Sequence, residues 1–252
     1  MINKIQSLKY KLLDTKEIFI TKCAAIENEI LAIKTDNPNI LPISDGIVNV
    51  DNYLSAKYKI LWILKESNDL DENNEGGGWS LTKAINGLNS WEDQPQRGRT
   101  TFQRIIYSTY GLLNDFVLWN DMPYISNEEV FESIKKIAYI NIKKFPGYAT
   151  SISKEIDQAY EENKVLLKRQ IDLYNPDIII AGNTLEYFFE DLSIPFDNKK
   201  SNGKTAYYPT KERLYIHPYH PKVRPVTISE ENYCNDIILA GKDWVENQKN
   251  YL

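Results

Sequence analysis

A few polar residues in this sequence follow short apolar runs, at the points where buried strands would end. Glu66 and Asn141 each lie at or just after such a run, and two histidines, His217 and His220, follow another. Carboxylate, amide and imidazole side chains are groups that exchange protons or hydrogen-bond a ligand. These residues are therefore the candidate site, although they lie far apart in the chain.

The elements that would position them alternate between strand and helix. Apolar runs of strand length, rich in bulky side chains, are typical of strands covered on both faces. Stretches with helical spacing separate them, which predicts an open α/β/α sandwich around a mostly parallel, four-stranded sheet. Ligands bind such sheets beyond the carboxyl ends of the strands. The four expected strands are Tyr58–Leu64, Ala138–Ile142, Asp177–Ala181 and Arg213–Ile216.

Length and composition are those of one globular domain, residues 1–252, with an N-terminal helical extension over about residues 1–36. No apolar run approaches the roughly 20 residues that span a bilayer, so no membrane contact is expected. The first residues lack the apolar core of a secretory signal, which favours the cytoplasm. Two cysteines exclude a four-cysteine metal cluster, and the net charge of −5 counts weakly against nucleic acid as a partner.

The ordered set of strand-end residues resembles the uracil-DNA glycosylase superfamily. The match runs from about Tyr58 to Arg224 and consists of short motifs. The first motif of the family carries Gly and Pro, and both are missing from the corresponding Leu64-Lys65-Glu66-Ser67. Glu66 falls where relatives hold a water-activating or charge-stabilising group. Trp79, thirteen positions further on, matches the spacing of the aromatic residue that stacks on a flipped base.

The resemblance implies roles for the remaining motif residues. Asn141 would hydrogen-bond the base edge, because an amide offers both a donor and an acceptor. His220, in Tyr219-His220-Pro221, would donate a hydrogen bond to the leaving base, with His217 as a competing register. The residues that would push into the helix and hold phosphates come next: Lys222, Val223 and Arg224.

The implied activity is that of a monofunctional DNA glycosylase which hydrolyses an N-glycosidic bond without metal or other cofactor. Bond cleavage builds positive charge on the sugar and negative charge on the base, so a carboxylate and a hydrogen-bond donor suit the two sides. Uracil-specific relatives place a Tyr where this chain has Asn68. The hypothesis is that the pocket accepts uracil or a larger, 5-modified pyrimidine such as phage-modified cytosine, as in antiviral defence.

Other interpretations stay open from sequence alone. Glu66 would be a solvated loop carboxylate, and the two histidines would be turn residues or a metal pair without a nearby third ligand. Phe102 is the second choice for stacking. A basic face including Lys143 and Lys144 would contact single- or double-stranded DNA. The alternative functions are a non-catalytic nucleic-acid or nucleotide-binding module and a nucleoside or nucleotide hydrolase, and a monomer is expected.

Overall fold

The computed structural model describes residues 2–251, with side chains from residue 15 onward. Its α-helices are α1 (Ile2–Leu31), α2 (Val50–Ser55), α3 (Leu81–Asn86), α4 (Arg99–Leu113), α5 (Glu128–Phe131), α6 (Ser153–Tyr174) and α7 (Glu230–Asn247). Its strands are β1 (Gly46–Ile47), β2 (Ile60–Leu64), β3 (Ile137–Asn141), β4 (Ile178–Ala181), β5 (Lys200–Asn202), β6 (Thr205–Pro209) and β7 (Leu214–His217). Short 3₁₀ turns are η1 (Trp119–Asp121), η2 (Glu132–Lys136), η3 (Leu185–Phe188), η4 (Phe196–Asn198) and η5 (Gln248–Asn250).

The sheet has seven strands in the order β1-β3-β2-β4-β7-β6-β5, not the four that the sequence predicts. The four expected strands are present as its parallel centre, β3-β2-β4-β7. The additional strands pair antiparallel at the two edges, with β1 beside β3 and the β5-β6 hairpin beside β7. A strand of two residues such as β1 carries too little of the periodicity on which a strand prediction depends.

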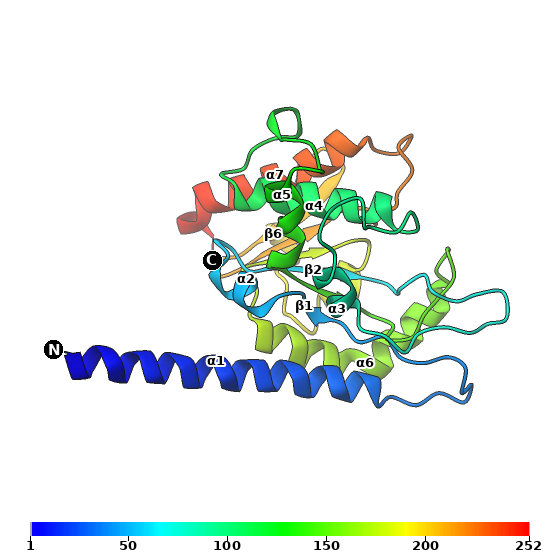
Figure 1. Cartoon of the computed structure of the whole chain (residues 1–252). Helices are drawn as coiled ribbons and strands as arrows, with labels where there is room; N and C mark the ends of the chain where they lie inside the picture. Colours follow the sequence, from blue (N-terminus) through cyan, green and yellow to red (C-terminus); the bar gives the residue numbers. More distant parts are fainter. Residues whose placement is uncertain (1, 252) are drawn as a thin grey trace.

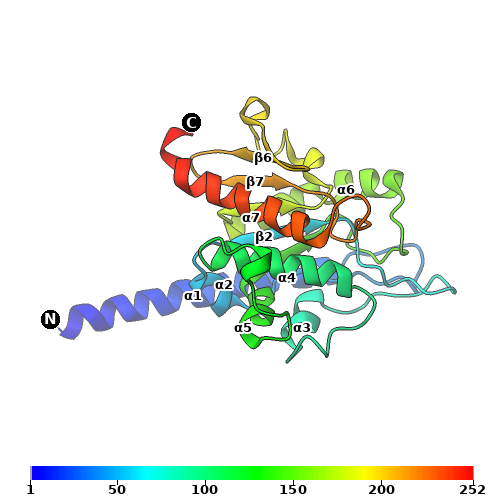
Figure 2. The ribbon, with the colours of Figure 1, turned by 90° about the horizontal axis from the view of Figure 1, so that it is seen from above.

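Helices cover both faces of the sheet (Figure 1). α4 and α7 pack together on one face, and α1 and α6 lie along the other (Figures 1 and 2). Within β2, Trp62 faces the α4 side and Leu61 and Ile63 face the α6 side, and all three are fully buried. Burial on both faces explains why this strand has a continuous apolar sequence.

Local sequence sets the ends of the two long helices α6 and α7. Ser229 caps α7, as its position predicts, by accepting a hydrogen bond from the Asn232 N–H. α6 ends at Asn175, which adopts a left-handed conformation with φ 44°. None of the helices of residues 2–251 is long and apolar enough to cross a membrane.

Candidate active site

A pocket of about 660 Å³ opens at the carboxyl edge of the parallel strands. The strand register brings this edge together, because Leu64 of β2 pairs with Asn141 of β3, and Ile63 pairs with Ala181 of β4. The walls come from the loops after β2, β3 and β7 and from the start of α4. Predicted site residues that line it are Glu66, Asn68, Trp79, Phe102, His220 and Lys222.

The loops after β2 and β3 are joined by backbone hydrogen bonds. The Gly147 N–H donates to the Ser67 carbonyl at 2.8 Å, and the Gly147 carbonyl accepts from the Asp69 N–H at 3.1 Å. A Cβ at Gly147 would lie 2.7 Å from Cγ of Glu66. Only glycine therefore lets the second loop approach the Glu66 side chain so closely.

The carboxyl group of Glu66 is partly withdrawn from water. Burial raises its pKa above the ordinary value, while a hydrogen bond with the Ser151 side chain and the nearby charges of Lys143 and Lys65 oppose that rise. Its Oε2 atom is buried and has no hydrogen-bond partner among the described residues. A carboxylate with an unused acceptor in a pocket can bind and orient a water molecule or a ligand N–H group.

His220 is neutral at physiological pH. Burial lowers its pKa to about 4, and the positive charges of Lys65 and Lys222 act in the same direction. Its Nδ1 accepts the backbone N–H of Lys222 at 3.0 Å. The proton of the neutral ring therefore lies on Nε2, which makes that atom a hydrogen-bond donor.

The other histidine has a different place. His217 ends β7, and its Nε2 lies 2.9 Å from Oε2 of Glu186. It is not among the residues that line the pocket, whereas His220 is. Of the two histidines between which the sequence leaves the choice open, only His220 therefore lines the pocket.

The two asparagines differ in access to the pocket. Asn68 lines it, and the Oδ1 atom of Asn68 is buried without a partner among the described residues. Asn141 lies behind the pocket wall: it is 3 % exposed, and its Nδ2 donates to Oγ of Ser67 at 3.2 Å. The Asn141 backbone N–H donates to Asp45 at 2.8 Å, and Oδ1 of Asn141 is unpaired.

Four aromatic rings line the pocket, those of Trp79, Phe102, Tyr139 and Tyr148. Nε1 of Trp79 donates to Oδ2 of Asp69 at 2.8 Å, which also accepts the Gly77 N–H at 3.0 Å. The rings of Phe102 and Tyr139 lie 6.3 Å apart with 33° between their planes. Asp69 and Tyr139 were missed at the sequence level, because an acid in a loop and a tyrosine inside a strand are too common to indicate a site.

The expected DNA-binding residues are dispersed. Lys222 and Arg224 are exposed, and Lys222 lines the pocket, whereas Val223 is half-buried and packs against the core. Val226 is instead the projecting apolar residue of this loop, at 91 % exposure. Lys143 pairs with Glu155 at 2.6 Å.

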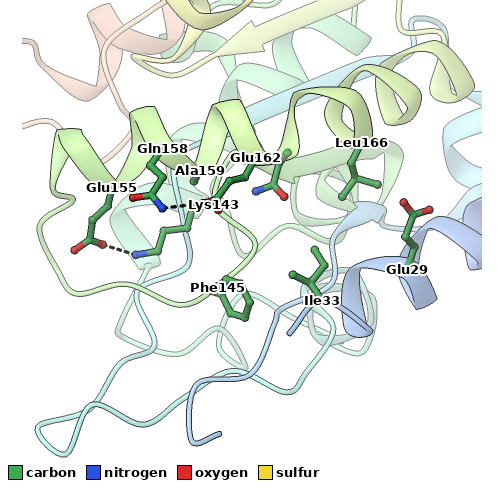
Figure 3. A pocket seen from close by; sticks show the side chains of 10 residues that line it. Glu29, Ile33, Lys143, Phe145, Glu155, Gln158, Ala159, Glu162 and Leu166 are labelled. Atoms are coloured by element: carbon green, nitrogen blue, oxygen red, sulfur yellow. Dashed lines mark hydrogen bonds and ion pairs between the residues drawn. The ribbon is translucent and has the colours of Figure 1, made fainter. Parts of the chain in front are cut away.

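Lys143 belongs to a second cavity, of about 420 Å³, between the end of α1, α6 and the loop after β3 (Figure 3). Figure 3 shows Glu155 reaching Lys143 at one end, with Phe145 and Ile33 below this pair and Leu166 toward the other end. Glu29 of this cavity is occupied by a two-point ion pair with Arg169. Glu162 accepts a hydrogen bond from the Gln158 amide at 2.7 Å, so each charged group of this cavity has a partner.

Lys144 cannot contact DNA. Its side chain is completely buried, and Nζ lies 2.8 Å from both carboxylate oxygens of Asp45 and 3.0 Å from Oε1 of Gln170. The prediction that Lys144 belongs to a basic face is therefore wrong. Two adjacent lysines in a loop give no sequence signal for which of them turns inward.

An arginine that the sequence analysis overlooked holds the loop that carries His220. Arg104 of α4 is fully buried, and its Nη1 donates to the carbonyls of Pro221 and Val223 at 2.9 and 2.8 Å. The guanidinium lies over the ring of Tyr233, 5.1 Å from its centroid, and the Tyr233 hydroxyl donates to the Tyr219 carbonyl at 3.0 Å. We name Arg104 and Tyr233 the loop clamp. The sequence signal that could have identified Arg104 is its position among the apolar residues of a predicted helix.

Fold and site together define an α/β protein with an aromatic-walled, polar pocket at the carboxyl edge of its parallel strands. Among the side chains that the structure describes, from residue 15 onward, no three of His, Cys, Asp or Glu form a group that could hold a metal ion. Comparison with models of known protein families and with curated proteins gives no match.

Proposed function

We propose that this protein is a monofunctional DNA glycosylase of the uracil-DNA glycosylase type, which removes a flipped-out base by hydrolysis. The observation that carries the proposal is the presence of Glu66 and His220 in one pocket, together with aromatic side chains. Hydrolysis of an N-glycosidic bond needs a carboxylate near the sugar and a donor at the base. These are the two groups that the pocket supplies.

Glu66 acts on the sugar side in this proposal. Its ionised carboxylate orients the attacking water and stabilises the positive charge that develops on the sugar. The raised pKa makes it a stronger base than an exposed glutamate. Water is the nucleophile, so the reaction as proposed uses no metal or organic cofactor.

His220 acts on the base side. As a neutral ring with its proton on Nε2, it donates a hydrogen bond to the oxygen of the leaving base, where negative charge develops. The contact from the Lys222 N–H to Nδ1 fixes this tautomer. His217, paired with Glu186 outside the pocket, has no part in the reaction.

The flipped base stacks on Trp79 or Phe102, because a base in a duplex must leave the stack to be reached. Oδ1 of Asn68 is an acceptor in the pocket without a donor from the protein. A base with an exocyclic amino group would supply a donor here, which favours a cytosine-type base over uracil. A 5-modified cytosine of phage DNA is then the proposed substrate, and antiviral defence the proposed role.

The test is base release from oligonucleotides that carry uracil, cytosine or 5-modified cytosine, followed by alkaline cleavage of abasic sites. We expect release to fall at least about a hundredfold in Glu66→Gln and in His220→Ala. His217→Ala is the matched control and keeps its activity. Strand cleavage without alkali would instead indicate a Schiff base, for which Lys222 at the pocket is the candidate.

Two outcomes would replace the proposal. DNA binding without base release on any substrate, by folded protein, would identify a non-catalytic binding module. Hydrolysis of free nucleosides without affinity for DNA would identify a nucleoside hydrolase, which the net charge of −5 would suit better than a DNA enzyme.

A further inference from the structure

The pocket has a second end, at the loop before α4 and the first turn of that helix. It is lined by Gln94, by the exposed Arg97 and by the first turn of α4 with Gly98, Thr100 and Thr101. The two lining carboxylates, Glu66 and Asp69, belong to the loop after β2. The α4 end of the pocket thus contains one cation and no acid.

The start of α4 leaves backbone donors free. Gly98 precedes the helix with φ 107°, no side chain caps it, and its first turn contains no acidic residue. Within the described chain, the N–H groups of Thr100 and Thr101 have no hydrogen-bond acceptor. Free N–H groups and the dipole of a helix of 15 residues attract an anion at this position.

Gln94 is an independent sign of a ligand. Its side chain lines the pocket and is 5 % exposed, yet its amide makes no hydrogen bond to any described residue. The backbone around it is fixed, because the Gln94 carbonyl accepts Nε of Arg99 at 2.9 Å. An amide that lines a pocket without a protein partner offers a bound molecule both a donor and an acceptor.

We propose that Gln94, Arg97 and the first turn of α4 form a binding subsite for a phosphate group. The phosphate would be either the monoester of a nucleotide or a backbone diester of DNA, and both offer oxygens to these donors. On the proposed function, which this inference extends, it is the phosphate next to the flipped nucleotide. The subsite then anchors the nucleotide at one end of the pocket while Glu66 and His220 act at the other.

The experiment follows backbone and side-chain amide signals of the ¹⁵N-labelled full chain during titration with inorganic phosphate, deoxycytidine monophosphate or a short single-stranded oligonucleotide. We expect the signals of Thr100, Thr101 and the Gln94 amide to shift. Arg97→Gln removes one charge-assisted contact and should weaken the affinity about tenfold. Lys211→Gln, which removes an exposed charge outside the pocket, is the matched control.

Binding of the monophosphate alone would assign the subsite to a nucleotide monoester, and binding of the oligonucleotide through the same signals would assign it to a DNA diester. Absence of shifts in the first turn of α4 with all three probes, or equal affinity of Arg97→Gln and Lys211→Gln, would overturn the proposal. Base release is measured separately. Phosphate binding without base release would defeat the glycosylase proposal and leave the subsite standing.

Discussion

Burial shifts the pKa values of the two proposed reacting groups, Glu66 and His220, in opposite directions. It raises the pKa of Glu66 and lowers the pKa of His220 to about 4, because in each case water exclusion disfavours the charged form. At neutral pH the proposed roles require an ionised Glu66 and an uncharged His220. The pocket environment keeps His220 uncharged. It also raises the lower limit of the pH range in which Glu66 is ionised.

The pH dependence of base release follows from these directions. Activity should be constant near neutral pH and fall on acidification through the raised pKa of Glu66, since the carboxylate must be ionised. His220 is protonated only near pH 4, so its titration does not change the activity in the neutral range. The check is kcat/KM against pH. A loss of activity that begins near the ordinary histidine pKa of about 6.5 would contradict this assignment.

Gly147→Ala should separate activity from stability. The added methyl group would meet the Glu66 side chain at 2.7 Å, and a flexible glutamate moves aside more easily than backbone. We expect the free energy of unfolding to change by at most about 1 kcal/mol while base release falls at least about tenfold. Urea unfolding and the oligonucleotide assay measure the two effects. A fully active variant would show that Glu66 needs no fixed position.

At the scale of elements, the loop clamp ties α4 and α7 to the segment after β7. Arg104→Met removes the donors for the carbonyls of Pro221 and Val223, each worth about 1 kcal/mol. The freed loop should expose His220 to water, so its pKa should rise from about 4 toward 6.5. NMR titration in a His217→Gln background leaves one histidine signal to follow. If the pKa of His220 is unchanged in folded Arg104→Met, Arg104 does not position the loop that carries His220.

The parallel strands were predictable because burial on both faces leaves a continuous apolar run in the sequence. Strand β1 was not predictable, because two residues are too few for such a pattern. Among the residues that line the pocket, Glu66 and His220 follow strands and could be named as candidates, although the sequence left His217 open beside His220. Gln94 and Asp69 lie in polar loops, where sequence alone does not indicate which side chains a tertiary fold turns inward.

At the scale of the whole molecule, the buried pair of Asp45 and Lys144 joins β1 and β3, at one edge of the sheet, to α6. Burial lowers the pKa of Lys144, and the carboxylate of Asp45 opposes that change. Asp45 also accepts the backbone N–H of Asn141 at 2.8 Å and Nε2 of Gln170 at 2.9 Å. Loss of the lysine would leave a buried carboxylate with fewer donors.

Lys144→Met should therefore lower the free energy of unfolding by about 3 to 5 kcal/mol. Its neighbour supplies the control, since Lys143 pairs with a half-exposed Glu155 and Lys143→Met should cost about 1 kcal/mol or less. Urea unfolding of both variants gives the comparison. Equal losses would mean that the buried pair contributes no more than the outer one.

The pocket joins segments that lie far apart in the chain and are therefore synthesised at different times. Well over half of the chain separates Glu66 from His220, and Gln94 and Tyr139 lie between them. Contacts of such long range form late and slowly during folding, because a large loop must close before they are made. A nascent chain must extend through His220 before this pocket can exist. A chain that ends earlier lacks one wall of the pocket.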